Sequence, residues 1–429
     1  MLVKETLQEY LKPYEVNFEK LHQEYRPMLR LVKELIGVVP NCDPILEIWP
    51  TGFRTYNLFV PNFLNLPHSL FGKKELKSMM GLAMYTSSRA AECMYCSAHC
   101  CSYALRRGLS EDAITGVRTL KEKSVVTVSK GLATVPASLK KQELIEFRSH
   151  FTQKEEDWIV FSTVLMGFLN KFMDAVGVEL EPEAIHDVGE LLYPTGWTHG
   201  KHLKDKIKSK ASIIEVDNFK TFFRVIKEAP GAIKLEKNWT KEVPNTGEKA
   251  SFYLQEYIGY SFPILKNIKH KRIVTSLTTI LRDNLNSKTT VIGLPVKVIV
   301  GYIFAIAVEN ENLELESIAL AKVLAPELNE DFFFTIKNIF VSSKNQSIEV
   351  LKLSLESELE EGVLSELDLI ILLLAKGMAS SPSAIESHLI ALVEENLKPE
   401  IVVEVAVWIS IQQAIHRLDR YYEISNQLE

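Results

Sequence analysis

The sequence has few cysteines, five among 429 residues, and four of them fall within one stretch, ECMYCSAHCC at residues 92–101. It lacks a basic run interleaved with aromatic residues, and its formal net charge is −6, so we expect neither a nucleic acid nor an anionic membrane as partner. Residues 1–37 lack the apolar core of a secretory signal. We therefore expect a cytoplasmic chain whose thiols stay reduced and form no disulfide framework.

Long apolar runs are also scarce. Residues 290–308, TVIGLPVKVIVGYIFAIAV, approach the length of a membrane span, but Pro295 and Lys297 lie inside the run. The matching stretch of the first half is not a span. We therefore expect a buried helix here and no membrane-spanning segment.

What the sequence does contain is helical apolar spacing, as at Leu364, Leu367, Ile371 and Leu374. Strand-like alternation is rare and short, so the prediction is an all-α fold. Four blocks of the first half also match blocks of the second half, which indicates two copies of one helical module: 76–88 with 296–308, 108–114 with 327–333, 129–147 with 375–393, and 151–172 with 397–418.

The repeat predicts a domain organisation. Its parts are a helical N-terminal extension (1–72), a cysteine-bearing module (73–208), a connector (209–265) and a degenerate second module (266–429). Three stretches are punctuated by Pro, Gly and Asn and are expected to be connecting segments rather than core: 46–72, 182–220 and 228–250.

The cysteine cluster falls at the start of a predicted helix that ends at Gly108. At helical spacing, Cys93, Cys96 and Cys100 lie within about 60° of one another on one face. His99 projects about 60° from Cys96, close enough to share its surroundings, whereas Cys101 points elsewhere and is expected to be a packing residue.

A Cys-x-x-Cys pair at a helix start has a chemical use. The unpaired N–H groups of the first turn stabilise a thiolate and lower the pKa of one cysteine. The second thiol closes a disulfide once the first is oxidised, and a nearby imidazole moves the proton. Two other interpretations stay open: a zinc site, although four ligands from one helix are strained, and buried thiols that only pack in a helix seam.

The stretch SRAAECMYCSAHCCSYALRRGLSEDAI resembles the core of the alkylhydroperoxidase D-like, carboxymuconolactone decarboxylase superfamily. Residues 121–183 resemble the rest of the module in peroxidase-related members, with Asn170-Lys171 where they have an Asn-Arg-like pair. Residues 194–202, PTGWTHGKH, resemble a stretch that follows the module. The resemblance implies an all-helical bundle that pairs with a second copy. Two tandem copies would build that pair, a pseudo-dimer, within one chain.

The resemblance also implies roles for the site residues. Cys96 would attack a hydroperoxide and become a sulfenic acid, Cys93 would donate a proton and close the disulfide, and His99 would belong to the proton relay. Peroxidase members complete the relay with a glutamate about three helical turns before the first cysteine, where this chain has Gly81. The second copy has no cysteine, so we interpret it as a scaffold.

Other candidates have plainer interpretations. His199 and His202 lie in a Gly-containing connector, where a histidine is more often solvated than catalytic. Trp49, Phe53 and Tyr56 either line a pocket entrance or pack in the core, and Cys42, His388 and His416 are expected to be packing or interface residues.

These observations predict a thiol-dependent redox enzyme, with Cys93, Cys96 and His99 as its catalytic residues and without cofactor or metal. It would reduce an alkyl hydroperoxide or a disulfide and receive electrons from an external thiol reductant protein. A non-catalytic binding or assembly protein is the alternative, and a decarboxylase-type or isomerase activity on a small acid is a third hypothesis. Whether the chain forms homo-oligomers stays open.

Overall fold

The computed structural model describes residues 4–66, 68–203, 214, 216–344, 346–359 and 362–428. All regular secondary structure in these ranges is helical, so the prediction of an all-α fold is confirmed. The predicted boundary between the first module and the connector, at residues 208 and 209, lies outside the described residues.

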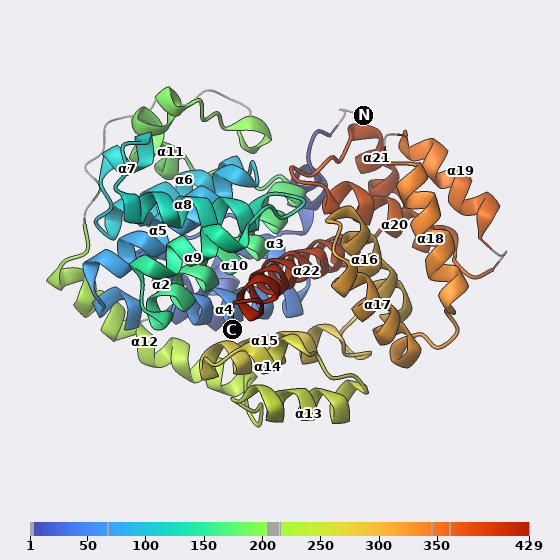
Figure 1. The fold of residues 1–429 in the computed structure, drawn as a ribbon. Coiled ribbons are helices and arrows are strands. Elements are labelled where there is room, and N and C mark those ends of the chain that lie inside the picture. The colour runs from blue at the N-terminus through green and yellow to red at the C-terminus, as the bar shows by residue number, and fades with distance from the viewer. Residues whose placement is uncertain are drawn as a thin grey trace.

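Among the described residues, the first half of the chain forms eleven α-helices. Figure 1 shows their arrangement. Four precede the cysteine module: α1 (Leu7–Leu11), α2 (Phe18–Ile36), α3 (Cys42–Leu46) and α4 (Pro50–Phe63). Seven lie within it: α5 (Lys74–Ala90), α6 (Met94–Arg106), α7 (Glu111–Thr115), α8 (Leu120–Ala133), α9 (Lys141–His150), α10 (Gln153–Val176) and α11 (Pro182–Leu192). Short 3₁₀ turns are η1 (Lys12–Tyr14), η2 (His68–Phe71), η3 (Tyr193–Thr195) and η4 (Gly200–His202).

Four helices then run beneath both halves: α12 (Phe219–Trp239), α13 (Gly247–Ile258), α14 (Ile264–Asn267) and α15 (Lys271–Asn284). The C-terminal half comprises α16 (Leu294–Ala307), α17 (Glu311–Leu324), α18 (Glu330–Ser342), α19 (Ile348–Glu358), α20 (Glu366–Ala379), α21 (Ser387–Asn396) and α22 (Pro399–Asn426).

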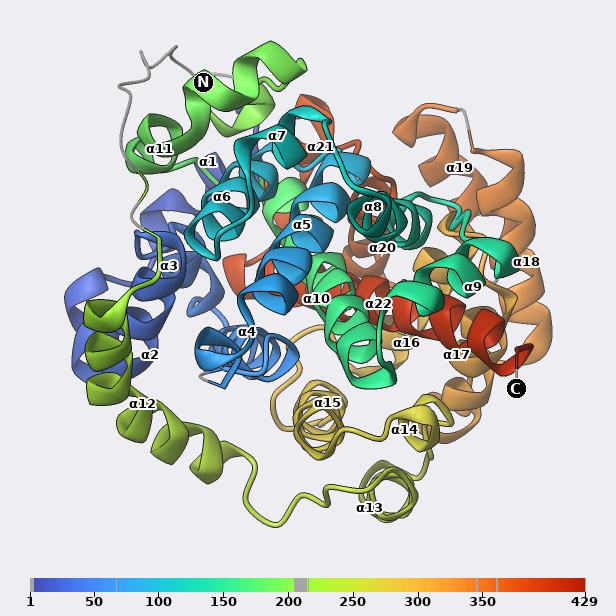
Figure 2. The same cartoon turned by 60° about the vertical axis from the view of Figure 1, so that its left-hand side comes forward.

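Helices α10 and α22 pack against each other at the centre (Figure 2). On one side, α5 packs on α10, α6 and α8, and on the other α16 packs on α22, α17 and α20. By length and composition alone, α10 and α22 could cross a membrane, but their most apolar windows are 94% and 100% buried within the protein. Helices that are apolar on all sides belong in a core, and these two form the seam between the halves.

Local sequence signals set the ends of the helices that matter for the site. Helix α10 begins with a capping box in which Thr152 and Glu155 satisfy each other's backbone N–H groups, and it ends at Gly177 with a φ of +73°. Helix α5 crosses α6 where Gly81 meets Ala104, and a Cβ at Gly81 would lie only 2.7 Å from the Ala104 Cα. Glycine is required here because the two backbones nearly touch.

The expectation that three punctuated stretches are connecting segments is wrong for part of each stretch. Residues 46–72 contain α4, residues 182–220 contain α11, and residues 228–250 overlap α12 and α13. Pro50 and Pro182 each occupy the first turn of a helix, where the missing N–H has no intrahelical partner to lose. Proline therefore starts these helices rather than interrupting them.

The apolar run at 290–308 forms α16, a buried helix of 14 residues, as predicted. Lys297 inside it is fully buried and forms an ion pair with Glu404 of α22, which is also fully buried. Lys297 Nζ also donates to the carbonyl of Asn284 at 2.7 Å, and Glu404 accepts the Val291 N–H at 2.6 Å. This pairing explains how a lysine is accommodated in an otherwise apolar helix.

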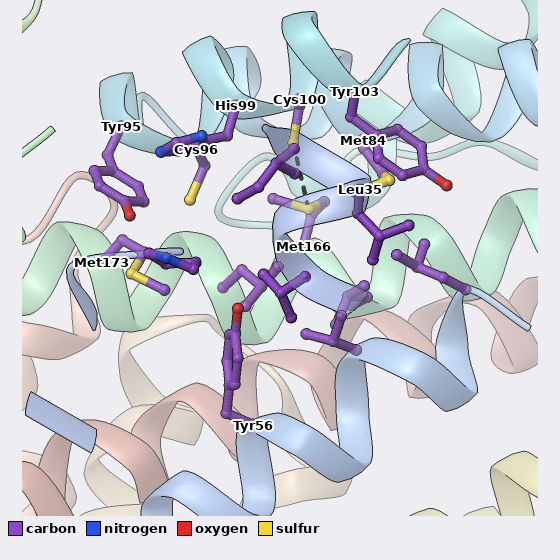
Figure 3. Close-up of a pocket in the computed structure, with 17 residues that line it drawn as sticks. Leu35, Tyr56, Met84, Tyr95, Cys96, His99, Cys100, Tyr103, Met166 and Met173 are labelled. Carbon is purple, nitrogen blue, oxygen red and sulfur yellow. Dashed lines mark hydrogen bonds between the residues drawn. The ribbon is translucent and has the colours of Figure 1, made fainter. Parts of the chain in front are cut away.

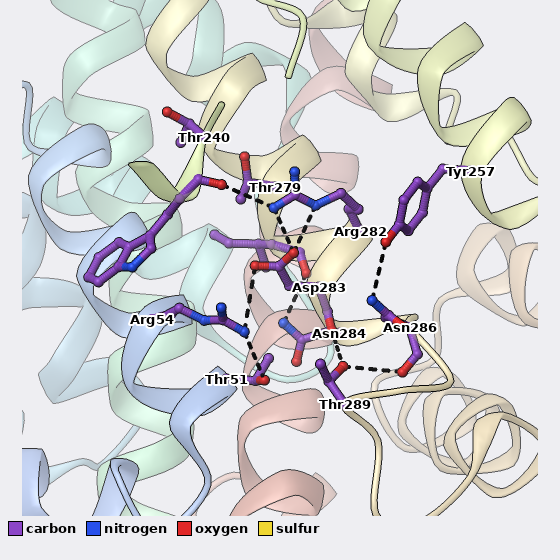
Figure 4. Close-up of polar contacts among 12 residues, drawn as sticks. Thr51, Arg54, Thr240, Tyr257, Thr279, Arg282, Asp283, Asn284, Asn286 and Thr289 are labelled. Carbon is purple, nitrogen blue, oxygen red and sulfur yellow. Dashed lines mark hydrogen bonds and ion pairs between the residues drawn. The ribbon is translucent and has the colours of Figure 1, made fainter. Parts of the chain in front are cut away.

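A second polar network attaches α15 to α4 and to the end of α12 (Figure 4). Arg282 donates to Asp283 at 2.8 Å and to the carbonyl of Trp239 at 3.0 Å, while Asp283 lies 4.0 Å from Arg54 of α4. Because these contacts join segments that are far apart in sequence, they hold the lower layer of helices against the first half.

Candidate active site

The two central cysteines lie at the start of α6, and Cys93 is its N-cap residue. The Cys96 N–H donates to Cys93 Sγ at 3.4 Å, which brings the two residues together across the first turn. The preceding residue, Glu92, has a φ of +55°, which turns the chain sharply from α5 into α6. All five cysteines of the chain are free and buried.

Cys96 opens into a small apolar cavity between α2, α4, α6 and α10. Figure 3 shows its sulfur directed into this cavity beside the ring of His99. Tyr56 of α4 points toward it from the opposite wall, and Cys100 lines it one turn further along α6. The remaining wall consists of apolar and aromatic side chains, including Leu35, Met84, Tyr103, Met166 and Met173. Such a cavity suits a small, slender apolar molecule.

Of the three aromatic candidates from the sequence, only Tyr56 lines the cavity. Phe53 is fully buried in the core. Trp49 is also buried, and its indole N–H donates to the carbonyl of Thr289 at 3.0 Å, in the segment before α16. Phe53 and Trp49 therefore have structural roles.

His99 is held by a buried carboxylate that the sequence did not point to. Its Nε2 lies 2.7 Å from Glu181 Oε2. Glu181 is the N-cap residue of α11 and also accepts the Tyr95 hydroxyl at 2.9 Å and the Asn41 N–H at 2.6 Å. Burial pushes the pKa of Glu181 upward, but the charge and hydrogen bond of His99 and the N–H of Asn41 outweigh it, so the net pKa is lowered.

A second buried carboxyl group interacts with Glu181, that of Asp43, and its pKa shifts in the opposite direction. Burial and then the negative charge of Glu181 raise the pKa of Asp43 well above its ordinary value. The pKa values of the two neighbouring carboxyl groups are therefore pushed in opposite directions. An ionised Glu181 needs a donor, which favours the His99 tautomer with its proton on Nε2. His99 Nδ1 is buried and has no hydrogen-bond partner within the described residues.

The family's glutamate position is closed to any side chain in this fold. At Gly81 a Cβ would lie 2.8 Å from the Ala104 Cβ, so a glutamate there would separate α5 from α6. The other carboxylates near the cysteines in sequence do not reach His99, since Glu75 pairs with Lys121 at 2.8 Å and Glu92 is exposed. The carboxylate comes instead from the linker between α10 and α11.

The pKa of the Cys96 thiol runs against its expected role as the attacking thiolate. The sequence predicted that the helix N-terminus lowers the pKa of one thiol of the pair, and the resemblance made Cys96 the attacking thiolate. Cys93 occupies the N-cap position, and Cys96 lies one turn inside the helix. Burial, then the hydrogen bond and charge of Cys93, raise the pKa of the Cys96 thiol well above its ordinary value.

A buried cation from the other half of the chain lies within electrostatic reach of both thiols. Arg417 of α22 is buried, and its Nη1 donates to the carbonyl of Thr163 at 2.8 Å. Burial lowers the pKa of Arg417 to about 9, and the charges of Cys96 and Cys93 act in the opposite direction. Its guanidinium would favour a thiolate at either sulfur.

The remaining candidates are placed as follows. Cys42 and Cys101 are fully buried packing residues, as expected. His199 is partly exposed, but the expectation of a solvated loop histidine is wrong for His202, which is 2% exposed. The ring of His202 lies 5.8 Å from that of Tyr95, and burial lowers its pKa to about 4. No group of three His, Cys, Asp or Glu side chains suitable for a metal occurs in the part of the chain that the structure describes.

Comparison with known proteins adds little. No family model matches the chain, and no curated protein matches it. Among solved structures, the apo form of the debrominase Bmp8 is similar at 19% sequence identity with a TM-score of 0.34, covering 41% of this chain and 96% of that chain. The alkylhydroperoxidase D-like resemblance therefore remains a prediction from the sequence motif.

Proposed function

We propose that this protein reduces small apolar organic hydroperoxides with a Cys93/Cys96 dithiol, as a diverged member of the alkylhydroperoxidase D-like superfamily. The observation that carries the proposal is the position of Cys96, whose sulfur faces an apolar cavity beside a His99–Glu181 pair. A nucleophile, a base and a residue that orients the base are the parts that activated-nucleophile catalysis requires.

The proposed reaction proceeds in two steps. In the first, His99 Nδ1 takes the proton of Cys96, and the thiolate attacks the terminal oxygen of the hydroperoxide. The O–O bond breaks, the leaving alkoxide takes the proton to become an alcohol, and Cys96 becomes a sulfenic acid. In the second, the Cys93 sulfur attacks the sulfenic sulfur, a disulfide forms and water leaves. An external dithiol then returns two electrons.

Burial of the thiol restricts which molecules can react with it. Cys96 is 4% exposed and Cys93 is fully buried. A folded protein carrying a disulfide cannot reach Cys96 through this cavity, whereas a small apolar hydroperoxide gains free energy by leaving water for it. The proposal therefore favours a hydroperoxide over a disulfide as the oxidising substrate, and it requires the site to open when the reductant acts.

The proposal includes a tandem arrangement in which the second half replaces a partner subunit. Similar turns support it, since Glu92 before α6 and Glu309 before α17 have φ values of +55° and +54°. The next residues, Cys93 and Asn310, are both N-caps that accept the N–H three residues on. This register matches Asn310 to Cys93 and Leu313 to Cys96. The gapless alignment of 76–88 with 296–308 instead matches Leu313 to Cys93, so the two registers differ by three residues.

The alternative proposal is a non-catalytic binding or assembly protein that keeps the fold. One observation favours it, namely the raised pKa of the Cys96 thiol, because a neutral thiol is a poor nucleophile. In that case the apolar cavity would bind a ligand without turnover. The two proposals differ in whether a hydroperoxide oxidises the thiols.

The decisive experiment is a thiol count on the fully reduced protein before and after one equivalent of cumene hydroperoxide, with mass spectrometry of the peptides. The proposal expects the loss of two thiols, a Cys93–Cys96 disulfide in the wild type and no oxidation in Cys96→Ser. Cys101→Ala is the matched control, because Cys101 is buried on the same helix but does not line the cavity. Five intact thiols in the wild type would reject the peroxidase proposal in favour of the binding protein.

A further inference from the structure

A second cavity lies on another face of α5 and shares no lining residue with the apolar one. It is open to solvent and is lined by α5, α7, α8 and η3. Its polar character comes from three cationic and three hydroxyl side chains: Arg89, Arg118, Lys130, Tyr85, Thr86 and Thr195. No carboxylate lines it. This composition is unusual in a chain whose net charge is −6.

The two arginines are held in place by neutral acceptors. Arg89 donates from Nη1 to the Thr195 hydroxyl at 3.0 Å, and Arg118 donates from Nε to the carbonyl of Ala113 at 2.8 Å. Within the described residues neither arginine, nor Lys130, forms an ion pair with a carboxylate. A guanidinium has five N–H donors, so each arginine keeps further donors for a ligand.

We propose that this cavity is a binding site for a phosphate-bearing small molecule. Two fixed guanidinium groups and an ammonium group match the charge and the several acceptor oxygens of a phosphate, and a single carboxylate would leave cations unpaired. The hydroxyl of Thr86 adds a donor, and Val126 provides an apolar wall for an organic group. The inference does not depend on the proposed peroxidase, because the cysteines do not line this cavity.

The test is calorimetric titration of the reduced full-length protein with inorganic pyrophosphate. Saturable binding is expected, and Lys130→Gln should weaken it about tenfold, with a similar loss in Arg118→Gln. Lys154→Gln is the matched control, because Lys154 is also exposed but does not line the cavity. Its affinity should equal that of the wild type.

Lys130 is exposed, so its replacement should leave the melting temperature unchanged and keep the test valid even if Arg118→Gln loosens α7. The assignment is overturned if the wild type shows no saturable binding, or if Lys130→Gln binds pyrophosphate as tightly as Lys154→Gln. It is also overturned if, at matched ionic strength, acetate displaces bound pyrophosphate as well as inorganic phosphate does. The cavity would then recognise negative charge without recognising phosphate.

Discussion

Glu181 Oε2 lies 2.7 Å from His99 Nε2, although the two residues are 82 positions apart in the chain. The pair orients the imidazole and leaves Nδ1 without a hydrogen-bond partner in the described part of the chain. In many enzymes a carboxylate fixes the tautomer of a histidine in this way. If Cys96 is a nucleophile, its activation should depend on Glu181 as much as on His99.

Replacement of Glu181 by glutamine should therefore slow the oxidation of Cys96 by cumene hydroperoxide by about 100-fold, which is the contribution typical of a general base. Stopped-flow measurement of thiol loss across pH checks this, because a merely structural role would not change the pH profile. Glu183→Gln is the control, since Glu183 is exposed in the first turn of the same helix. Equal rates in both variants would remove Glu181 from the relay.

The electrostatic role of Arg417 predicts a shift in thiol reactivity. In Arg417→Met the pH for half-maximal alkylation of Cys96 by iodoacetamide should rise by about one unit or more, because a buried cation that favours thiolate is lost. Arg417→Lys should retain much of the wild-type behaviour. The control is Arg420→Met, one turn along α22, where Arg420 pairs with Glu423. An unchanged alkylation profile in Arg417→Met would contradict the assignment.

The contact at Gly81 predicts a loss of stability on adding a single methyl group. Gly81→Ala should lower the free energy of unfolding by about 1–3 kcal/mol, because its Cβ would lie 2.7 Å from the Ala104 Cα. Urea titration measures the change. Ala104→Gly in the Gly81→Ala background removes part of the clash, so the double variant should be less destabilised than the sum of the two single changes.

The buried ion pair between α16 and α22 predicts a strongly non-additive result. Lys297→Met alone should cost about 3–5 kcal/mol, because Glu404 is left charged and buried. The double variant Lys297→Met/Glu404→Leu should recover much of that loss, since neither charge remains. A double-mutant cycle by denaturant unfolding measures the coupling, and additive costs would show that the two side chains act independently.

Two buried histidines predict how stability depends on pH. Burial lowers the pKa of His202 to about 4 and that of His416 to about 3, from an ordinary 6.5. Between these values the unfolded chain binds protons that the folded chain does not, so the free energy of unfolding should fall as the pH falls below about 6.5. His202 alone contributes up to about 3 kcal/mol of this loss by pH 4. Urea titrations at several pH values should show a shallower dependence in His202→Gln.

The sequence was sufficient for the fold class because apolar spacing marks α16 and the central helices directly. It failed at Pro50 and Pro182, since a proline that starts a helix and one that interrupts it look alike until the helix is seen. Local periodicity also carries no information on which helices pack together. The contact of α10 with α22 had to come from three-dimensional structure.

The site was recognisable only where it is contiguous. Cys93, Cys96 and His99 lie within seven residues, and the structure brings the two cysteines together at the start of α6 and His99 to the same cavity as Cys96. Glu181 lies outside that stretch and Arg417 lies in the other half, so no spacing rule could connect them to the cysteines. The raised pKa of the Cys96 thiol was hidden for a similar reason, because its largest cause is burial, which depends on helices distant in sequence.

The seam between α10 and α22 has a consequence for how the protein behaves on dilution. Both helices belong to one polypeptide, so the contact is intramolecular and lowering the protein concentration cannot separate its two sides. Arg417 therefore stays within electrostatic reach of Cys93 and Cys96 at any concentration. The two sides are also free to differ, because a substitution on one side is not repeated on the other. A single chain can in this way keep thiols on one side and a cation on the other.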